Sequence, residues 1–230
     1  MADRIPLFPL ELVLFPGAKL PLHIFEPRYR EMVGECIAKQ MEFGIVCAFP
    51  EAPGEQHLEE TSDDDDFEAD DDAADSYYVA RIGCTARITA IPQRYDDGRM
   101  DILCLGVRRF RVKRIIEERS FREAEVEWIV NEDLHTDAKQ RARIVALHNK
   151  MLMLAFEEGS AVDLRAPEHC EHLAFALGHM LPFDLRLKQA ILESDSEQAR
   201  LAILARAYQA LITRAESVIH TVESAPKHVM

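Results

Sequence analysis

The stretch that decides the fold lies near the N-terminus, at residues 6–32, and reads PLFPLELVLFPGAKLPLHIFEPRYREM. Five prolines interrupt this apolar run, so it lacks the unbroken apolar centre of a signal peptide and is unable to span a membrane. The dipeptide Pro16-Gly17 is typical of a turn, because glycine readily adopts a positive φ. The stretch therefore predicts two short extended segments, around residues 10–15 and 20–25, with a turn between them.

A helix and a further strand are expected directly after this stretch. Pro27 fits the first turn of a helix, which we expect over roughly residues 28–40. Residues 43–49, FGIVCAF, form a continuous apolar run that predicts a buried strand. One face of the helix is apolar at helical spacing, and it comprises Tyr29, Met32, Val33, Cys36 and Ile37.

Most of the negative charge of the chain lies in one segment. Residues 59–75 contain eleven acidic residues and no basic one, so the formal net charge of −14 for the 230 residues would be −3 without them. Such a segment repels phosphate backbones, and we expect no nucleic-acid partner. Its composition predicts a flexible acidic insertion at about residues 51–76. A solvated linker is the favoured interpretation, a cation-binding or partner-docking role stays open, and the spacing of an EF-hand calcium loop is absent.

Residues 78–130 show the period of two that is typical of strands. The dipeptide Asp97-Gly98 predicts a hairpin turn, and Gly106 predicts a bulge or a close approach of two backbones. With the N-terminal strands, this region predicts about six antiparallel strands, enough to curl into a barrel. The apolar positions of the alternating runs include Ile82, Cys84, Ala86, Ile88, Ala90, Met100, Ile102, Cys104, Ala124, Val126 and Trp128.

From about residue 133 onward the apolar spacing becomes helical. Asp137 with Gln140, and Ser194 with Glu197, each form the pattern of an N-terminal capping box. We expect helices over residues 137–159, 167–182, 184–192 and about 195–222. The inward face of the last helix is predicted to carry Leu201, Leu204, Tyr208, Leu211, Ala215 and Ile219.

A β-rich half followed by a helical half predicts the α+β class. We expect an antiparallel β pseudo-barrel with a short helix over residues 1–131 and an α-helical bundle over residues 132–224. The five cysteines contain no C-x-x-C pair, and an odd number of cysteines without an export signal fits a reducing compartment. The sequence therefore predicts a cytoplasmic protein.

The sequence contains none of the common catalytic motifs. It lacks G-x-x-x-x-G-K-[ST], G-x-S-x-G and H-E-x-x-H, which argues against a P-loop, a nucleophile elbow and a zinc-protease helix. The segment APEHCEHLAF at residues 166–175 places His169 and His172 one helical turn apart, with Glu168 and Cys170 beside them. Zinc needs three or four converging ligands, so histidines on a helix surface are the favoured interpretation. We expect no metal and no cofactor.

Three chemically distinctive residues, His23, Glu26 and Arg28, lie within six positions of one another. Glu26 has apolar neighbours, and a carboxylate beside an apolar barrel needs a partner. Arg28, or Arg109 in the segment GVRRFRV, is the expected partner, and a buried ion pair between barrel and helix is the favoured interpretation. The alternative is a hydrolase built around His23, Glu26 and Arg109, which requires these groups to converge in a pocket with perturbed pKa values.

The opening stretch closely resembles the start of the Lon N-terminal domain family, the substrate-binding domain of ATP-dependent Lon proteases. From Pro6 to Tyr29 the family pattern PLFPL…VLFPG…LPLHIFEPRY is matched almost residue for residue. The resemblance covers about residues 5–215. Further matching segments follow in the family's order, namely FGIV at 43–46, VARIGCTARI at 79–88, GVRRFRV at 106–112 and LKQAILES at 187–194.

The resemblance implies a PUA-like barrel followed by a helical bundle, and recognition of unfolded or tagged polypeptides. In Lon proteases an AAA+ ATPase and a Ser–Lys protease domain follow this region, whereas this sequence ends at Met230 without either. We therefore expect a stand-alone, non-catalytic adaptor that binds unfolded or peptide segments, with a protease or chaperone as a further partner and no membrane partner. The final helix is long enough to form a homodimer contact. The candidate binding residues are His23, Phe25, Glu26, Arg28, Tyr29, Arg109 and Phe110.

Overall fold

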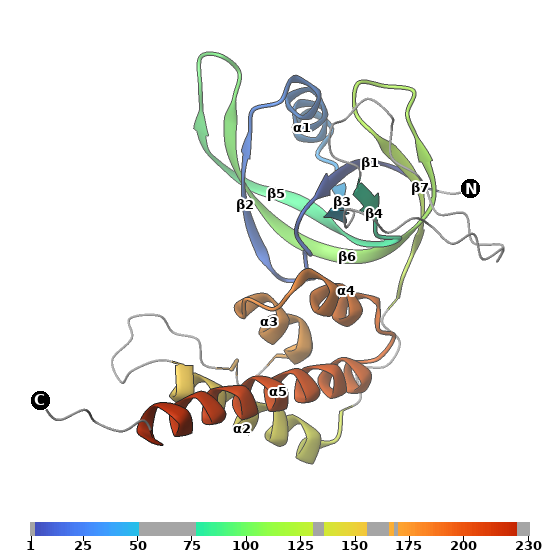
Figure 1. The fold of residues 1–230 in the computed structure, drawn as a ribbon. Coiled ribbons are helices and arrows are strands. Elements are labelled where there is room, and N and C mark those ends of the chain that lie inside the picture. Colours follow the sequence, from blue (N-terminus) through green and yellow to red (C-terminus); the bar gives the residue numbers. More distant parts are fainter. Residues whose placement is uncertain (1–2, 51–76, 131–135, 156–165, 168–169, 225–230) are drawn as a thin grey trace, which may run out of the picture. The chain divides into compact units, whose positions relative to one another are not determined.

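The computed structural model describes most of the chain (Figure 1). The predicted acidic insertion at about residues 51–76 lies outside the described residues, as do residue 159, where a helix was expected to end, and Glu168 and His169 of the candidate metal segment. Within the described residues the protein has an α+β fold with a seven-stranded sheet and five helices, which confirms the predicted class. The described residues are 3–50, 77–130, 136–155, 166–167 and 170–224.

The chain divides into two compact units. The first combines Met1–Val130 with Phe183–Glu193, and the second combines Asn131–Pro182 with Ser194–Met230. The sequence places one boundary after residue 131 and does not show that a later helix groups with the strands. The first unit contains β1 (Asp3–Leu10), β2 (Lys19–Ile24), α1 (Pro27–Lys39), β3 (Phe43–Pro50), β4 (Tyr77–Val79), β5 (Ile82–Arg94), β6 (Met100–Ile116), β7 (Glu123–Trp128) and α4 (Leu185–Glu193). The second contains α2 (Ala138–Ala155), α3 (Leu173–Met180) and α5 (Glu197–Ser224).

Strands of the first unit form a closed ring of pairings (Figure 1). β1, β7, β6, β5 and β3 follow one another as hydrogen-bonded neighbours, and β1 also pairs with β3. This last pairing is parallel, with Leu7 opposite Gly44, whereas the other pairings are antiparallel. β2 adds to β6, and the short strand β4 adds to β3. The local alternation of the sequence does not predict the parallel pairing, because its two strands are far apart along the chain.

The first strand lies earlier in the chain than the sequence predicts. β1 occupies Asp3–Leu10 instead of residues 10–15, and it contains Pro6 and Pro9. Proline is unable to donate a ladder hydrogen bond and is depleted in strand interiors, which is why the prediction placed the strand after these residues. The second predicted segment and the buried strand agree with β2 and β3.

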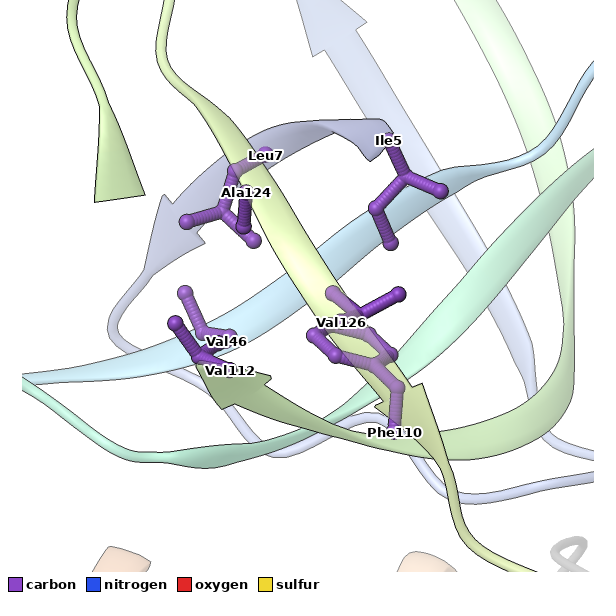
Figure 2. Packing of buried hydrophobic residues seen from close by; sticks show 7 residues of the cluster. All are labelled: Ile5, Leu7, Val46, Phe110, Val112, Ala124 and Val126. Carbon is purple, nitrogen blue, oxygen red and sulfur yellow. The ribbon is translucent and has the colours of Figure 1, made fainter. Parts of the chain in front are cut away.

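The barrel interior contains a compact apolar cluster, which Figure 2 shows from close by. Phe110 is its largest side chain and is fully buried. A Cβ added at Gly83 would lie 2.7 Å from Phe110 Cζ and 2.3 Å from the carbonyl oxygen of Ile45. A Cβ at Gly44 would also lie 2.7 Å from Phe110 Cζ, so the two glycines leave the space that the ring fills. The cluster consists of Ile5, Leu7, Val46, Phe110, Val112, Ala124 and Val126.

Two other glycines confirm features that the sequence predicts. Gly98 has a φ of 85° in the hairpin between β5 and β6, a conformation that favours glycine. At Gly106 two backbones approach closely, because an added Cβ would lie 2.2 Å from the carbonyl oxygen of Phe15. The N–H of Gly106 donates to the carbonyl oxygen of Ala18 at 2.9 Å, next to the start of β2.

α1 confirms the predicted helix to within one residue at each end. Glu26 is the N-cap residue and Pro27 occupies the first helical position, where an N–H would have no partner within the helix. The helix ends at Lys39, and the C-cap residue Gln40 has a left-handed φ of 53°. Its apolar face is buried and includes Tyr29, whose ring stacks on Phe8 with the centroids 4.0 Å apart.

α4 is joined to the strands of the first unit by two buried polar side chains. Arg109 is 2% exposed, and its Nη1 donates to the carbonyl oxygen of Leu192 at 2.5 Å. Leu192 lies in the last turn of α4, where the helix dipole favours a cation. Gln189 donates from Nε2 to the carbonyl oxygen of Ile82 at 2.9 Å. Both contacts fix the helix against β5 and β6.

Buried polar contacts also join the helices of the second unit. Glu197 and Arg200 of α5 are fully buried, with Oε2 and Nη1 3.3 Å apart. Glu197 also accepts the backbone N–H of Ala174 on α3 at 2.7 Å. Nδ1 of His148 on α2 lies 2.8 Å from the hydroxyl of Tyr208 on α5. These contacts hold α2 and α3 to α5.

Two helix starts differ from the prediction. α3 begins at Leu173 instead of Pro167, and the side chain of Ser196, not that of Ser194, caps the first turn of α5. Both differences are shifts along the chain of helices whose existence the sequence predicts. In the part of the chain that the structure describes, no helix is both long and apolar enough to cross a membrane.

Candidate functional site

One face of the sheet formed by β2, β6 and β5 is partly apolar although it lies outside the barrel core. Successive residues of a strand project to opposite sides of the sheet. Met100 and Ile102 of β6 are buried, so Asp101, Leu103 and Leu105 project to the other side, where all three are partly exposed. Partly exposed leucines on an outer face make this surface a candidate binding site.

We call this surface the outer sheet face and define it by rows of residues that lie opposite one another. Opposite residues on neighbouring strands project to the same side. The register of β5 against β6 shifts on both sides of Ala90, so the middle row is the least regular. The rows are Lys19, Leu105 and Arg87; then Pro21, Leu103 and Ala90; then His23, Asp101 and Gln93.

Three rings gather at the end of the outer sheet face where β2 leads into α1. Phe25 follows β2 and is 58% exposed. Its ring stacks on that of His23 with centroids 6.1 Å apart, and Tyr95 meets His23 edge-on at 5.8 Å. Tyr95 is itself 37% exposed. We call His23, Phe25 and Tyr95 the aromatic group.

The carboxylate of Asp101 holds two of these rings. Its Oδ1 lies 2.6 Å from Nδ1 of His23, and its Oδ2 accepts the hydroxyl of Tyr95 at 2.9 Å. These contacts, that of His23 first, hold the pKa of Asp101 below its ordinary value. The pKa of Tyr95 is raised, because its hydroxyl donates to Asp101. The rings are therefore fixed by polar contacts while their apolar faces stay accessible.

The hairpin that carries Tyr95 is fastened to α1. The guanidinium of Arg30 on α1 donates to the backbone carbonyl of Asp97 in the hairpin turn. Asp97 also pairs with Arg99 at 2.6 Å, and the pKa of Asp97 is lowered, first by the backbone N–H of Arg99. These contacts keep the hairpin end of the outer sheet face in place beside Phe25.

Positive charge gathers at the opposite end of the outer sheet face. Lys19, Arg87 and Arg108, which we call the cationic end, are all exposed. Glu42 lies 3.9 Å from Nε of Arg87 and 3.6 Å from Nε of Arg108, and it also accepts the hydroxyl of Thr85 at 2.7 Å. Among the described residues, Lys19 has no ion pair. One carboxylate thus faces more than one cation at this end.

Glu26 and Arg28 form the ion pair that the sequence predicts, but the pair is not buried. Nε of Arg28 lies 2.8 Å from Oε2 of Glu26, and the two side chains are 52% and 36% exposed. Both residues lie at the N-terminal end of α1, so solvent reaches the pair and its contribution to stability is small. The guanidinium of Arg28 also lies over the ring of Tyr29, 4.7 Å from its centroid.

The other three candidate residues lie in the interior. Tyr29 is 8% exposed, Arg109 2% and Phe110 0%. Their contacts are to Phe8, to the end of α4 and to the barrel cluster, as described above. Arg109 and Asp101, the partner of His23, are eight residues apart on β6, a separation of about 25 Å along a strand. The described residues therefore do not bring Arg109 next to His23 in the way that the hydrolase alternative requires.

Most residues of the outer sheet face, and Tyr95 of the aromatic group, were not among the candidates from the sequence. Tyr95, Asp101, Leu103 and Leu105 lie on β6 or its hairpin. The available signal was the run MDILCLGV at residues 100–107, which is apolar at both alternating positions. A strand with one face in the core and one in water alternates apolar with polar residues, so this run indicates a second apolar surface.

The described residues offer few groups suited to metal binding or covalent chemistry. Among them, no group of three His, Cys, Asp or Glu side chains is placed to hold a metal ion. Burial raises the pKa of four thiols to about 12, which leaves them protonated and poorly nucleophilic at neutral pH. These are Cys36, Cys47, Cys84 and Cys104.

Comparison with known families identifies the domain. Residues 4–207 match the family model described as the ATP-dependent protease La (LON) substrate-binding domain. The chain belongs to this family. Membership in the LON substrate-binding domain family confirms the resemblance carried by the opening stretch.

Whole Lon proteases are among the relatives of this LON substrate-binding domain. The Lon protease of Anaeromyxobacter dehalogenans (strain 2CP-C) is 23% identical over 207 residues, which are 87% of this chain and 22% of that protein. The Lon protease of Parabacteroides distasonis is 27% identical over 118 residues, which are 51% of this chain and 12% of that protein. The chain thus spans 22% or less of the length of these relatives.

Solved structures of LON N-terminal domains share the fold. The crystal structure of a Lon N-terminal domain protein from Xanthomonas campestris has a TM-score of 0.59 and 24% identity, over 88% of this chain and 96% of that one. The N-terminal domain of a Mycobacterium avium complex Lon protease has a TM-score of 0.57 and 14% identity, over 90% and 98%. At these identities the likeness establishes the fold alone.

Proposed function

We propose that this LON substrate-binding domain is a non-catalytic module that binds unfolded or peptide segments of other proteins on its outer sheet face. The aromatic group is the observation that carries the proposal. Phe25 is 58% exposed at the edge of a sheet face that also presents partly exposed leucines. Large exposed rings beside apolar area are typical of interaction surfaces.

The fixed geometry of the rings suits them to binding. Aromatic side chains bring large contact area at a low cost in conformational entropy, and binding hot spots are enriched in them. The contacts of Asp101 with His23 and Tyr95 remove part of the freedom that a ligand would otherwise have to remove. Unfolded polypeptides expose the apolar side chains that such a surface accepts.

The surroundings of His23 favour binding over hydrolysis. A hydrolytic dyad needs a nucleophile within hydrogen-bond reach of its base. Nδ1 of His23 pairs with Asp101, as in a catalytic triad, but among the described residues no hydroxyl or thiol forms a hydrogen bond with its Nε2. The ring instead packs with Phe25 and Tyr95. Glu26 is paired with a neighbouring arginine at the surface. These contacts support a module whose activity is recognition.

Fluorescence anisotropy with a labelled unfolded protein tests the proposal. Reduced, carboxymethylated α-lactalbumin is titrated with the chain and with the double variant Phe25→Ser/Tyr95→Ser. We expect the dissociation constant to rise about fivefold to thirtyfold in the double variant, the range of interface hot spots. Val218→Ser is the matched control, because Val218 is also 58% exposed but lies on α5.

Two results would count against the proposal. Equal dissociation constants for the double variant and the parent chain would show that the binding surface lies elsewhere. Cleavage of casein by the purified chain, lost in His23→Ala, would favour the hydrolase alternative.

A further inference from the structure

The outer sheet face has two chemically different ends. The aromatic group lies at the end with the row of His23, and the row of Lys19 and Arg87 lies at the other end of the same three strands. Pro21 and Leu103 provide apolar surface between them. A ligand that covers the whole face therefore contacts the rings at one end and the cations at the other.

Charge is balanced at the aromatic end. The carboxylate of Asp101 is engaged by two rings of the aromatic group. Glu26 and Arg28 form an exposed ion pair at 2.8 Å. Arg94 and Asp96, both exposed near the hairpin turn, carry opposite charges. This end consequently offers a ligand apolar contact without a net charge.

Charge is unbalanced at the cationic end. Glu42 pairs with both Arg87 and Arg108, at 3.9 Å and 3.6 Å, while the described residues give Lys19 no anionic partner. Lys19 and Arg87 flank Leu105 from the two neighbouring strands, so their Cα atoms are about 10 Å apart. A ligand carboxylate placed over Leu105 would have a cation on each side.

The length of the face sets the size of the ligand. Asp101 and Leu105 are four residues apart on β6, about 13 Å along a strand, and Phe25 lies two residues beyond His23. An extended segment of about six residues spans the distance from the ring of Phe25 to the row of Leu105. A helix of six residues would reach only about 9 Å.

We infer that the outer sheet face selects extended apolar polypeptide segments that carry a carboxylate about five residues beyond an aromatic or large apolar side chain. The apolar side chain packs on the aromatic group, and the carboxylate lies between Lys19 and Arg87. Either an acidic side chain or the C-terminal carboxylate of a chain supplies this group. The inference rests on the proposed function, and it adds a class of ligand to it.

Three labelled hexapeptides separate the two sources of the carboxylate. FLASLD with an amidated C-terminus carries an acidic side chain, FLASLN with a free C-terminus carries a terminal carboxylate, and amidated FLASLN carries neither. Fluorescence anisotropy at low ionic strength gives each dissociation constant. We expect at least one of the carboxylate peptides to bind about threefold to tenfold more tightly than the neutral one, as two exposed ion pairs allow.

Charge variants of the chain locate the effect. Lys19→Gln/Arg87→Gln is expected to abolish the preference for the carboxylate peptides, so that all three peptides bind with similar affinity. Lys139→Gln/Arg143→Gln removes the same charge from exposed positions on α2 and is expected to keep the preference. Binding of the neutral peptide shows that each variant is folded.

The outcomes distinguish this inference from the proposed function. Equal affinity for all three peptides, or a preference that survives in Lys19→Gln/Arg87→Gln, would overturn the inference. If the inference fails in this way but the neutral peptide still binds and Phe25→Ser weakens its binding, the proposed function is supported without the inference. If no peptide and no unfolded protein binds, both fail together.

Discussion

The Nδ1 atom of His23 lies 2.6 Å from the Oδ1 atom of Asp101, the residue directly opposite it on the neighbouring strand. The ladder between β2 and β6 fixes both backbones, so the contact sets the orientation of the imidazole. Phe25 and Tyr95 pack against that ring. A cross-strand polar pair thereby supports an exposed group of rings.

Asp101→Asn tests this support through its dependence on pH. The pKa of Asp101 is lowered in the folded chain, so its carboxylate stabilises the fold above the unfolded pKa of about 3.9. That stabilisation is lost as the pH falls through the lowered folded value. The variant should have a lower urea midpoint than the parent at pH 7, and the difference should be smaller at pH 3, below the unfolded pKa. The fluorescence of Trp128, the single tryptophan, reports on the first unit.

Asp96→Asn is the control for the change in charge. Asp96 lies in the same hairpin, and none of the described residues forms a hydrogen bond or ion pair with its carboxylate. Its urea midpoint should follow that of the parent at both pH values. A difference between Asp101→Asn and the parent that is the same at pH 7 and pH 3 would show that the carboxylate charge is not the cause.

Gly83→Ala should destabilise the barrel. The added Cβ would lie 2.3 Å from the carbonyl oxygen of Ile45 and 2.7 Å from Phe110 Cζ, so backbone must shift. Overpacking of this kind costs about 1–3 kcal/mol of the free energy of unfolding. Gly34→Ala on α1 is the matched control, since an added Cβ there meets nothing within 4 Å. It should stabilise the unit by about 0.5–1 kcal/mol, and a loss as large as that of Gly83→Ala would refute this account.

Glu197→Gln should destabilise the second unit. The change replaces the carboxylate that pairs with the buried Arg200 by a neutral amide, and breaking a buried ion pair costs about 3–5 kcal/mol. Burial already lowers the pKa of Arg200, while Glu197 opposes that shift. Hydrogen exchange of the amides of α3 and α5 measures the loss. Glu216→Gln, which breaks the exposed pair with Lys150, should cost at most about 1 kcal/mol. Equal protection factors in the two variants would contradict the importance of the buried pair.

The sequence predicts the features of the fold that depend on local patterns. Alternation identified the strands from residue 78 to 130, and Asp97-Gly98 identified a hairpin whose glycine has a φ of 85°. The parallel pairing of β1 with β3 and the grouping of α4 with the strands depend on contacts between distant segments. Such contacts leave no periodic signal in a single sequence.

Residues whose burial differs from the prediction also have physical explanations. The ladder between β5 and β6 shifts register between Gly106 and Arg109. Phe110 lies in the barrel cluster and Arg109 contacts the end of α4, so both are buried, although the sequence analysis counts them among the candidate binding residues. On α5, the predicted inward residue Leu211 is 42% exposed, and its neighbour Ile212 is buried. Over a long helix, an error of one position in the predicted buried face is enough to exchange Leu211 and Ile212.

The candidate site was predicted in part. Of the candidate residues, His23 lies on the outer sheet face and Phe25 lies directly beyond its end; that they bind a ligand stays a prediction. Leu103 and Leu105 were not predicted to lie on a binding surface. The alternation of Met100 and its neighbours was enough to predict the strand, so the residues between them were not considered further. The second apolar face becomes visible only when both sides of β6 are placed in the sheet.

The central claim is that polypeptides bind the outer sheet face, and backbone NMR tests it most directly. Unlabelled reduced, carboxymethylated α-lactalbumin is added to the ¹⁵N-labelled chain, and shifts of the amide signals are mapped. We predict that the largest changes fall on Phe25, Tyr95, Leu103 and Leu105, with little change on α2 and α5. Changes confined to α2 and α5, with the signals of β2 and β6 unmoved, would contradict the account.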